Sequence, residues 1–194
     1  MTDQDSESQA EPSWVSDGAG VHDQTLAENW LLCLRQERFR SRQSGKTHDY
    51  YVSHLADGVQ VVAITTDQCV VLVRQFRAGS RRDSLEMPGG LIEPGEDPCS
   101  AGPRELLEET GYAGLPPRRL GTIWSNPAIL SMRITTVVVR EARRVADPRP
   151  DQSEEVSVEL FPVPEIRSLI ERGRIDHGAS VAGLLWWLTI GPES

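Results

Sequence analysis

The segment from Gly89 to Tyr112, GGLIEPGEDPCSAGPRELLEETGY, restricts the possible folds of this 194-residue chain more than any other part. Before and after it, apolar residues recur in short bursts, whereas Arg104 to Thr110 has helical spacing. A helix set between strands on both sides in sequence indicates a mixed sheet with helices packed on it. The helix also carries Glu105, Glu108 and Glu109 side by side, although like charges at such spacings repel by roughly 0.2–0.5 kcal/mol per pair.

The bursts that predict strands share a high content of apolar and aromatic residues. They are Trp30–Phe39, Tyr50–His54, Val59–Thr65, Cys69–Phe76, Leu120–Trp124, Ile134–Arg140 and Val156–Phe161. The polar break from Thr66 to Gln68 is short enough for a hairpin. A short helix is expected over Glu165–Arg172, ended by Gly173. A final helix should turn one apolar stripe toward the sheet, formed by Val181, Leu184, Leu185 and Leu188.

Charge and composition divide the chain into a tail and one domain. Residues 1–24 are polar and acidic, which predicts a disordered acidic tail, and 25–194 should form the domain, with N-terminal strands over 25–56. The formal net charge is -9, but 7 of the 29 acidic residues precede residue 35, where the first of the 20 basic residues stands. The rest of the chain has no basic stripe, which argues against nucleic acid as a partner.

Cysteine usage and hydropathy indicate the compartment. Cys33, Cys69 and Cys99 fit neither a disulfide framework nor a zinc site, so we expect a reducing cytoplasm. The first residues, MTDQDSESQAEPS, lack the basic and apolar regions of a secretory signal, and no apolar run approaches the roughly 18 residues of a membrane span. The sequence therefore predicts no membrane association.

Local signals place the ends of the glutamate-bearing helix. Pro94 and Gly95 are typical of a type II turn before it, and Gly111 is suited to end it in a left-handed conformation. Because proline deep in a helix costs about 3 kcal/mol or more, we expect a late start, with Ser100 as the N-cap and Pro103 inside the first turn.

The glutamate cluster has two explanations. A solvated acidic face with Arg104 paired to Glu108 at i, i+4 accounts for only one of the three carboxylates. A hard divalent cation accounts for all of them, because Mg²⁺ takes oxygen ligands and commonly bridges protein carboxylates to substrate phosphates.

The order of residues in this segment resembles the Nudix hydrolase signature. Gly90, five residues, Glu96, seven residues, Arg104-Glu105-Leu106-Leu107-Glu108-Glu109, one residue and Gly111-Tyr112 match it at each defining position. The likeness is closest to the ADP-ribose pyrophosphatase and nucleotide-sugar hydrolase group, on VLVRQFRAGS before the segment, SNPAILS after it and IDHGASVAGLLWW near the end. It implies a Nudix-type α/β/α sandwich with a mixed sheet and an N-terminal antiparallel strand extension.

The resemblance also implies a reaction. Enzymes of this family cleave a nucleoside diphosphate linked to another moiety, with Mg²⁺ or in some cases Mn²⁺, and related enzymes are commonly homodimers. ADP-ribose, giving AMP and ribose 5-phosphate, is the expected substrate. The alternatives are nucleotide sugars of the GDP-mannose or UDP-glucose type, another diphosphate metabolite, or a sensor that binds nucleotide without cleaving it.

Site residues carried over by position from the family form a metal-binding group. Glu105, Glu109 and the carbonyl of Gly89 match metal ligands, with Glu108 a ligand or a water-mediated partner. Arg104, with Glu96, matches the pair that orients the carboxylates. Gly89 departs from the alanine that is frequent in the ADP-ribose group.

The remaining candidates have competing explanations. Arg77 matches a substrate-contacting arginine or forms a surface salt bridge, and Glu86 supports the site or closes a buried turn. Glu154, slightly preferred over Glu155, matches the general base, or both glutamates are simply exposed. Trp30 offers an aromatic surface on which the nucleobase of the substrate could stack, or it packs against the core or a partner subunit.

Overall fold

The computed structural model describes residues 11–18, 22–149 and 155–190. The chain forms two compact units, Met1–Leu55 with Asn126–Ser131, and Ala56–Ser125 with Met132–Ser194. The first unit thus ends one residue before the expected end of the N-terminal strands. Its second segment, Asn126–Ser131, has no counterpart in the sequence-based division.

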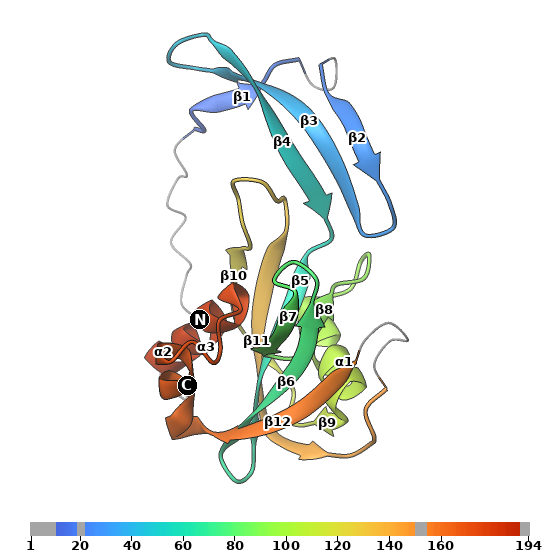
Figure 1. Ribbon diagram of the computed structural model, residues 1–194, viewed down its shortest axis with the longest axis vertical. Coiled ribbons are helices and arrows are strands. Elements are labelled where there is room, and N and C mark those ends of the chain that lie inside the picture. Colours follow the sequence, from blue (N-terminus) through green and yellow to red (C-terminus); the bar gives the residue numbers. More distant parts are fainter. Residues whose placement is uncertain (1–10, 19–21, 150–154, 191–194) are drawn as a thin grey trace. The chain divides into compact units, whose positions relative to one another are not determined.

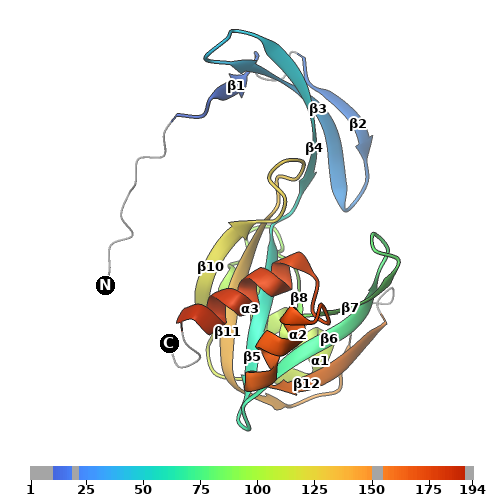
Figure 2. The ribbon, with the colours of Figure 1, turned by 60° about the vertical axis from the view of Figure 1, so that its left-hand side comes forward.

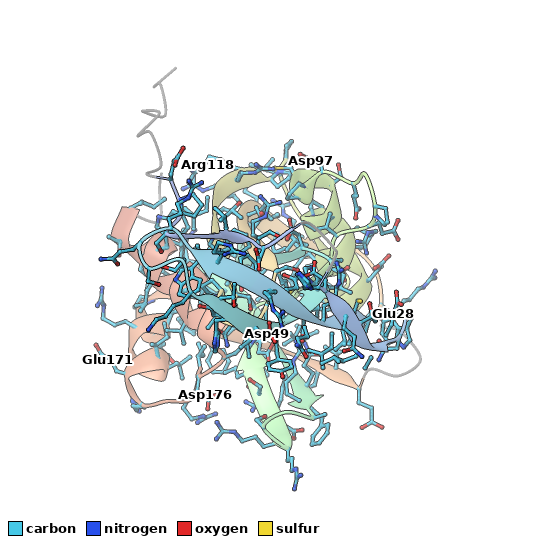
Figure 3. The ribbon with its side chains drawn as sticks, turned by 90° about the horizontal axis from the view of Figure 1, so that it is seen from above. Glu28, Asp49, Asp97, Arg118, Glu171 and Asp176 are labelled. Atoms are coloured by element: carbon cyan, nitrogen blue, oxygen red, sulfur yellow. The ribbon has the colours of Figure 1, made fainter. Side chains whose placement is uncertain are left out.

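The first unit is built on one antiparallel sheet (Figure 1). Its strands are β1 (Trp14–Ser16), β2 (Gln24–Glu28), β3 (Leu32–Ser41) and β4 (Thr47–Leu55). β3 is central, because it pairs with β4 along one edge and with β1 and β2 along the other. Charged pairs cross the strands, as between Arg38 and Asp49, where Nε lies 2.6 Å from Oδ1. Figure 3 labels Asp49 on this sheet. Among the described residues, every buried apolar side chain lies in the second unit, so cross-strand pairing contributes much of the order here.

Strand β1 corrects the expected tail. The prediction of disorder for residues 1–24 is wrong for Trp14–Ser16, which pair with β3, while 1–10 and 19–21 lie outside the described residues. The ring of Trp14 lies 5.9 Å from that of Tyr50 in an edge-to-face contact, and Asp17 accepts from Arg40 Nη2 at 2.6 Å. These partners lie more than twenty residues away in sequence, and composition does not reveal them.

The second unit contains a mixed sheet with helices on it. Its strands are β5 (Gly58–Thr65), β6 (Cys69–Arg77), β7 (Arg82–Glu86), β8 (Gly89–Leu91), β9 (Tyr112–Ala113), β10 (Arg118–Trp124), β11 (Arg133–Arg144) and β12 (Val156–Pro162). The helices are α1 (Pro98–Thr110), η1 (Val163–Glu165), α2 (Ile166–Glu171) and α3 (Gly178–Ile190). The order is β10-β11-β5-β6-β12, with β11 parallel to β5. The hairpin expected at Thr66 to Gln68 is confirmed.

The sheet forks where β5 and β6 stop pairing with each other and take different neighbours. β5 and β6 pair only at Ala63–Val71 and Ile64–Val70, and beyond these pairs β5 takes β8 as its neighbour while β6 takes β7. Met87 and Pro88 connect β7 to β8, and the Pro88 carbonyl accepts from the Val61 amide at 2.9 Å. The fork is therefore held at its base by backbone hydrogen bonds.

Two apolar clusters cover the two faces of the sheet, because residues alternate along each strand. In β5, Val62 and Ile64 contribute to the cluster beneath α2 and α3, whereas Val61 and Ala63 contribute to the cluster beneath α1. Figure 2 shows α3 lying across one face of β5 and β11, with α1 behind the sheet. The predicted α/β fold, with a mixed sheet and an N-terminal antiparallel extension, is confirmed.

The final helix follows its predicted stripe with one exchange. Val181, Leu184 and Leu188 pack in the cluster beneath α3, whereas Leu185 does not belong to it and Trp187, which is fully buried, does. The described helices include none that is long and apolar enough to cross a membrane.

Candidate metal-binding and substrate site

Helix α1 starts earlier than the sequence suggested. Asp97, with φ -81° and ψ 138°, is the N-cap, and its side chain accepts from the Cys99 amide at 2.8 Å. The prediction of Ser100 as the cap is therefore wrong, because the Asp97-Pro98 pair supplies both a capping carboxylate and a proline suited to the first helical position. At the other end, Gly111 has φ 72° and its amide donates to the Leu107 carbonyl, as predicted.

The early start places Pro103 inside the helix, not in its first turn. Proline has no amide hydrogen for the Cys99 carbonyl, so the helix lacks one internal hydrogen bond there. The preceding Gly102 has a separate reason, since a Cβ atom at that position would lie 2.5 Å from Cγ2 of Val137. Glycine thus lets α1 approach β11 closely.

Arg104 draws together the carboxylates on the outer face of α1. Its Nε and Nη2 donate to Oε1 and Oε2 of Glu96, both at 3.0 Å, and its Nη1 donates to Glu105 at 2.8 Å and to Glu108 at 3.2 Å. Nη2 also donates to the Leu91 carbonyl at 3.2 Å. The hydrogen bonds from Arg104 hold the pKa of Glu96 below its usual value, and the carboxylates raise that of Arg104. One guanidinium faces three carboxylates, which leaves an excess of negative charge.

Glu109 and Glu105 reach the backbone of β8. Glu109 is buried, 3% exposed, and its Oε2 accepts from the Gly89 amide at 2.9 Å. The carboxylate of Glu105 lies against Gly90, where an added Cβ would be 2.6 Å from Glu105 Cδ. A Cβ at Gly89 would lie 2.2 Å from the Val59 carbonyl oxygen, which explains why glycine, not alanine, stands there. The structure therefore brings together the predicted residues Gly89, Glu105, Glu108 and Glu109 with Arg104.

The donor atoms of this group suit a hard cation. Carboxylate and backbone carbonyl oxygens are the ligands that Mg²⁺ and similar ions take. Within the described ranges, however, no three Asp, Glu, His or Cys side chains already point to one common point. The reason lies in the contacts above, because Glu105 and Glu108 turn toward Arg104 and Glu109 turns toward the Gly89 amide. Binding an ion would require these carboxylates to exchange partners.

A second arginine cluster lies at the fork. Arg77 Nε and Nη2 donate to the two oxygens of Glu86 at 3.0 and 2.7 Å, and Glu86 is 1% exposed. His177 Nδ1 lies 3.3 Å from Glu86 Oε2. Burial tends to raise the pKa of Glu86, but the hydrogen bonds and charges of Arg77 and the field of His177 outweigh it and lower that pKa. The ion pair expected as the alternative role of Arg77 is present, though with a buried partner, and a phosphate contact by Arg77 stays a prediction.

Sequence reasoning missed two residues of this second cluster. His177 precedes α3 and Ser180 lies in its first turn, with His177 Nδ1 3.0 Å from Ser180 Oγ. Ser180 Oγ accepts from the Met87 amide at 3.0 Å. Both residues lie in IDHGASVAGLLWW, one of the segments that carry the resemblance, but that likeness assigns no role to either of them.

The other candidates are not joined to these clusters by the described contacts. Trp30 belongs to the first unit and is 90% exposed, so it does not pack in a core of the described residues. Glu154 lies outside the described residues, and its assignment as general base stays a prediction. Glu155 is exposed and borders a shallow pocket of about 500 Å³ between β6, β7 and β12, lined also by Arg74, Phe76 and Asp83.

Comparisons with known proteins place this geometry in a family context. A model of the NUDIX domain matches residues 54–184. An ADP-ribose pyrophosphatase of Bacillus subtilis (strain 168) is 30% identical over 135 residues, which cover 62% of this chain and 72% of that protein. An ADP-ribose pyrophosphatase of Mycobacterium tuberculosis is 25% identical over 167 residues, covering 85% and 80%. The crystal structure of an ADP compounds hydrolase has the same fold, with a TM-score of 0.75 at 22% identity over 88% of this chain and 94% of that one.

Proposed function

Because the chain belongs to the NUDIX family of hydrolases, we propose that it hydrolyses the diphosphate bond of ADP-ribose, giving AMP and ribose 5-phosphate, with Mg²⁺ as the preferred ion. The observation that carries this proposal is the cluster in which Arg104 faces three carboxylates next to the Gly89–Gly90 backbone. An excess of oxygen ligands on one turn of helix suits a divalent cation, and such a cation suits a diphosphate. Mn²⁺ is the expected substitute.

The choice of ADP-ribose rests on the relatives. Both relatives described above are ADP-ribose pyrophosphatases, and a structure with the same fold is an ADP compounds hydrolase. A mouse protein similar to 30% of this chain is an ADP-sugar pyrophosphatase. An adenosine diphosphate joined to a sugar is the chemistry common to these names, so nucleotide sugars enter the same assay as alternatives.

The proposed reaction assigns tasks to the residues of the glutamate cluster and to Glu154. When bound, a divalent cation neutralises phosphate charge and lowers the pKa of a coordinated water. Glu105, Glu109 and the Gly89 carbonyl would hold it, with Glu108 directly or through water, and Arg104 would keep these carboxylates together as the substrate enters. Water attacks one phosphorus atom, the bond from that phosphorus to the bridging oxygen breaks, and the attacking water gives up a proton, for which Glu154 is the proposed acceptor.

Product analysis tests the proposal. Purified full-length protein with Mg²⁺ is incubated with ADP-ribose, GDP-mannose, UDP-glucose and coenzyme A, and Glu109→Gln serves as the inactive control. AMP and ribose 5-phosphate from the wild type alone support the proposal. A product from only one of the other substrates would show that this substrate, not ADP-ribose, is the one hydrolysed. If the protein bound nucleotide but formed no product with either Mg²⁺ or Mn²⁺, it would be a nucleotide sensor and not a hydrolase.

We also propose that the first unit forms a homodimer. Large apolar side chains are exposed on it, including Leu26, Trp30 and Tyr51 at 43%, 90% and 57%. Exposed apolar groups on a unit without buried apolar side chains among its described residues favour association with a second copy. Static light scattering of the full chain would show twice the monomer mass, and a monomer at micromolar concentration would reject the dimer.

A further inference from the structure

The link between β7 and β8 is fixed at four successive residues. Glu86 pairs with Arg77, the Met87 amide donates to Ser180 Oγ, the Pro88 carbonyl accepts from the Val61 amide, and the Gly89 amide donates to Glu109. The last of these contacts reaches the glutamates of α1. The position of this link therefore decides where the Gly89 backbone meets the carboxylate of Glu109.

The amino end of α3 holds the first half of the link. Glu86, Met87 and Ser180 are almost fully buried, with exposures of 1%, 3% and 1%. His177 Nδ1 lies 3.0 Å from Ser180 Oγ and 3.3 Å from Glu86 Oε2. Since a lone pair at Nδ1 would repel the carboxylate, the imidazole tautomer with a hydrogen on Nδ1 fits these contacts; His177 then donates to Ser180 Oγ and turns the same N–H edge toward Glu86.

Close packing leaves this end of α3 little freedom. A Cβ at Gly183, one turn after Ser180, would lie 2.6 Å from both Met87 Cε and Gln60 Nε2. Gln60 Nε2 in turn donates to the Ala179 carbonyl at 2.9 Å and to Thr136 Oγ1 at 2.9 Å. The first turn of α3 is thus fixed to β5 and β11 as well as to the β7–β8 link.

We propose that His177 and Ser180 are positioning residues for the hydrolysis, which hold Glu86 and Met87 so that the Gly89 backbone and Glu109 keep their mutual geometry. This inference rests on the proposed function and deepens it. Neither side chain touches the glutamates of α1; both act through the backbone of the link. Partners placed behind the ligands of a metal site typically change affinity or activity by about 10- to 100-fold when they are removed.

The test compares variants that differ by one polar group. Ser180→Ala removes the acceptor of the Met87 amide. Ser168→Ala is the matched control, because Ser168 Oγ accepts from Arg172, the residue that caps the carboxyl end of α2. His177→Ala removes the Nδ1 donor, whereas His177→Asn keeps an amide donor near that position. The readouts are Mn²⁺ affinity by titration calorimetry, and kcat and KM for ADP-ribose.

We expect Ser180→Ala and His177→Ala to weaken Mn²⁺ binding by about 10-fold and to lower kcat more than they raise KM. Ser168→Ala and His177→Asn should stay within about twofold of the wild type on the same scale. Circular dichroism and the melting temperature show whether each variant is folded at the assay temperature.

Two results would overturn the inference. If the Ser180→Ala and His177→Ala variants fold and keep the Mn²⁺ affinity and kcat of the wild type, neither residue positions the site. If His177→Asn lost as much as His177→Ala, the Nδ1 donor would not be the group that positions the link. A wild type that neither binds Mn²⁺ nor hydrolyses ADP-ribose is a different result, because it would reject the proposed function itself and with it any positioning role.

Discussion

The two arginine clusters of the second unit differ in charge balance and in burial. Arg104 faces three carboxylates, and one of them, Glu108, has a side chain that is 49% exposed. Among the described residues, Arg77 faces one carboxylate, Glu86, whose side chain is 1% exposed while that of Arg77 is 43% exposed. The first cluster has more carboxylates than guanidinium groups and lies within reach of solvent, whereas in the second a partly exposed arginine pairs with a fully buried glutamate. Accessible carboxylates indicate a group that receives a cation, and an ion pair with one buried partner indicates a group that holds the chain in place.

This difference separates effects on activity from effects on stability. Removing one partner of a buried ion pair is strongly destabilising, because the other charge stays behind without compensation. Removing one carboxylate from a surplus leaves Arg104 with others and should change stability little. The variants below follow from this contrast.

The largest expected effect is on turnover in Glu109→Gln. Gln keeps an oxygen that can accept from the Gly89 amide, so the variant should fold normally. It loses the negative charge that a divalent cation requires. We expect kcat for ADP-ribose to fall on the order of 10²- to 10³-fold, measured by release of AMP. Turnover within twofold of the wild type would show that the charge of Glu109 has no catalytic use.

The next effect is on stability in Glu86→Ala. Arg77 and His177 would lose their common partner, and we expect the free energy of unfolding in urea to fall by about 2 to 3 kcal/mol, less than for a fully buried pair because Arg77 is partly exposed. The control is Glu108→Ala, which should stay within about 0.5 kcal/mol of the wild type. An equal decrease in the free energy of unfolding in the two variants would show that the two clusters do not differ in their contribution to stability.

Pro103→Ala should act in the opposite direction. Alanine restores an amide donor for the Cys99 carbonyl inside α1, so we expect a gain of about 1 to 2 kcal/mol and a melting temperature higher by roughly 2 to 8 °C. Turnover should be nearly unchanged, because Pro103 carries no ligand atom. A large loss of turnover would mean that Pro103 itself shapes the glutamate cluster.

Gly102→Ala is the companion variant with the reverse sign. The added methyl group would meet Val137, and we expect about 1 to 3 kcal/mol of destabilisation by urea unfolding. A neutral result would show that α1 can move away from β11 without loss.

The smallest effect is a pH dependence of stability. Burial lowers the pKa of His177 below its ordinary 6.5 and Arg77 lowers it further, against the attraction of Glu86 and Asp176. The unfolded chain therefore takes up the proton at a higher pH than the folded one, so stability should decline as pH falls through 6.5. Urea unfolding between pH 7.5 and 5.5 should show this decline in the wild type and a smaller one in His177→Asn. Identical slopes would exclude His177 as its source.

Features set by local sequence were predictable. The turn at Pro94-Gly95 is present, with φ 82° at Gly95, and Gly111 ends α1 in the left-handed region. The pairing of Arg104 with Glu108 follows from helical spacing alone. Each of these depends on residues within one turn of the chain, where backbone preference and spacing are sufficient.

Features set by distant partners were not predictable. β8 is a glycine-rich segment with little strand preference, and it becomes a strand because it pairs with residues Gly58 to Gln60 of β5. β1 likewise depends on β3. His177 and Ser180 acquire their roles only where α3 meets the β7–β8 link. Asp97 caps the helix in place of Ser100 because α1 accommodates Pro103 in its interior, which the local cost of proline in a helix does not predict.

Titration calorimetry of Mg²⁺ into the full-length protein, with and without AMP, tests the central claim most directly. The account predicts saturable binding to the wild type, and binding at least about 10-fold weaker in the double variant Glu105→Gln, Glu109→Gln, with the fold of both proteins unchanged. No heat of binding in the wild type under either condition, or the same isotherm in both proteins, would contradict the claim that the carboxylates of Glu105 and Glu109 hold a divalent cation.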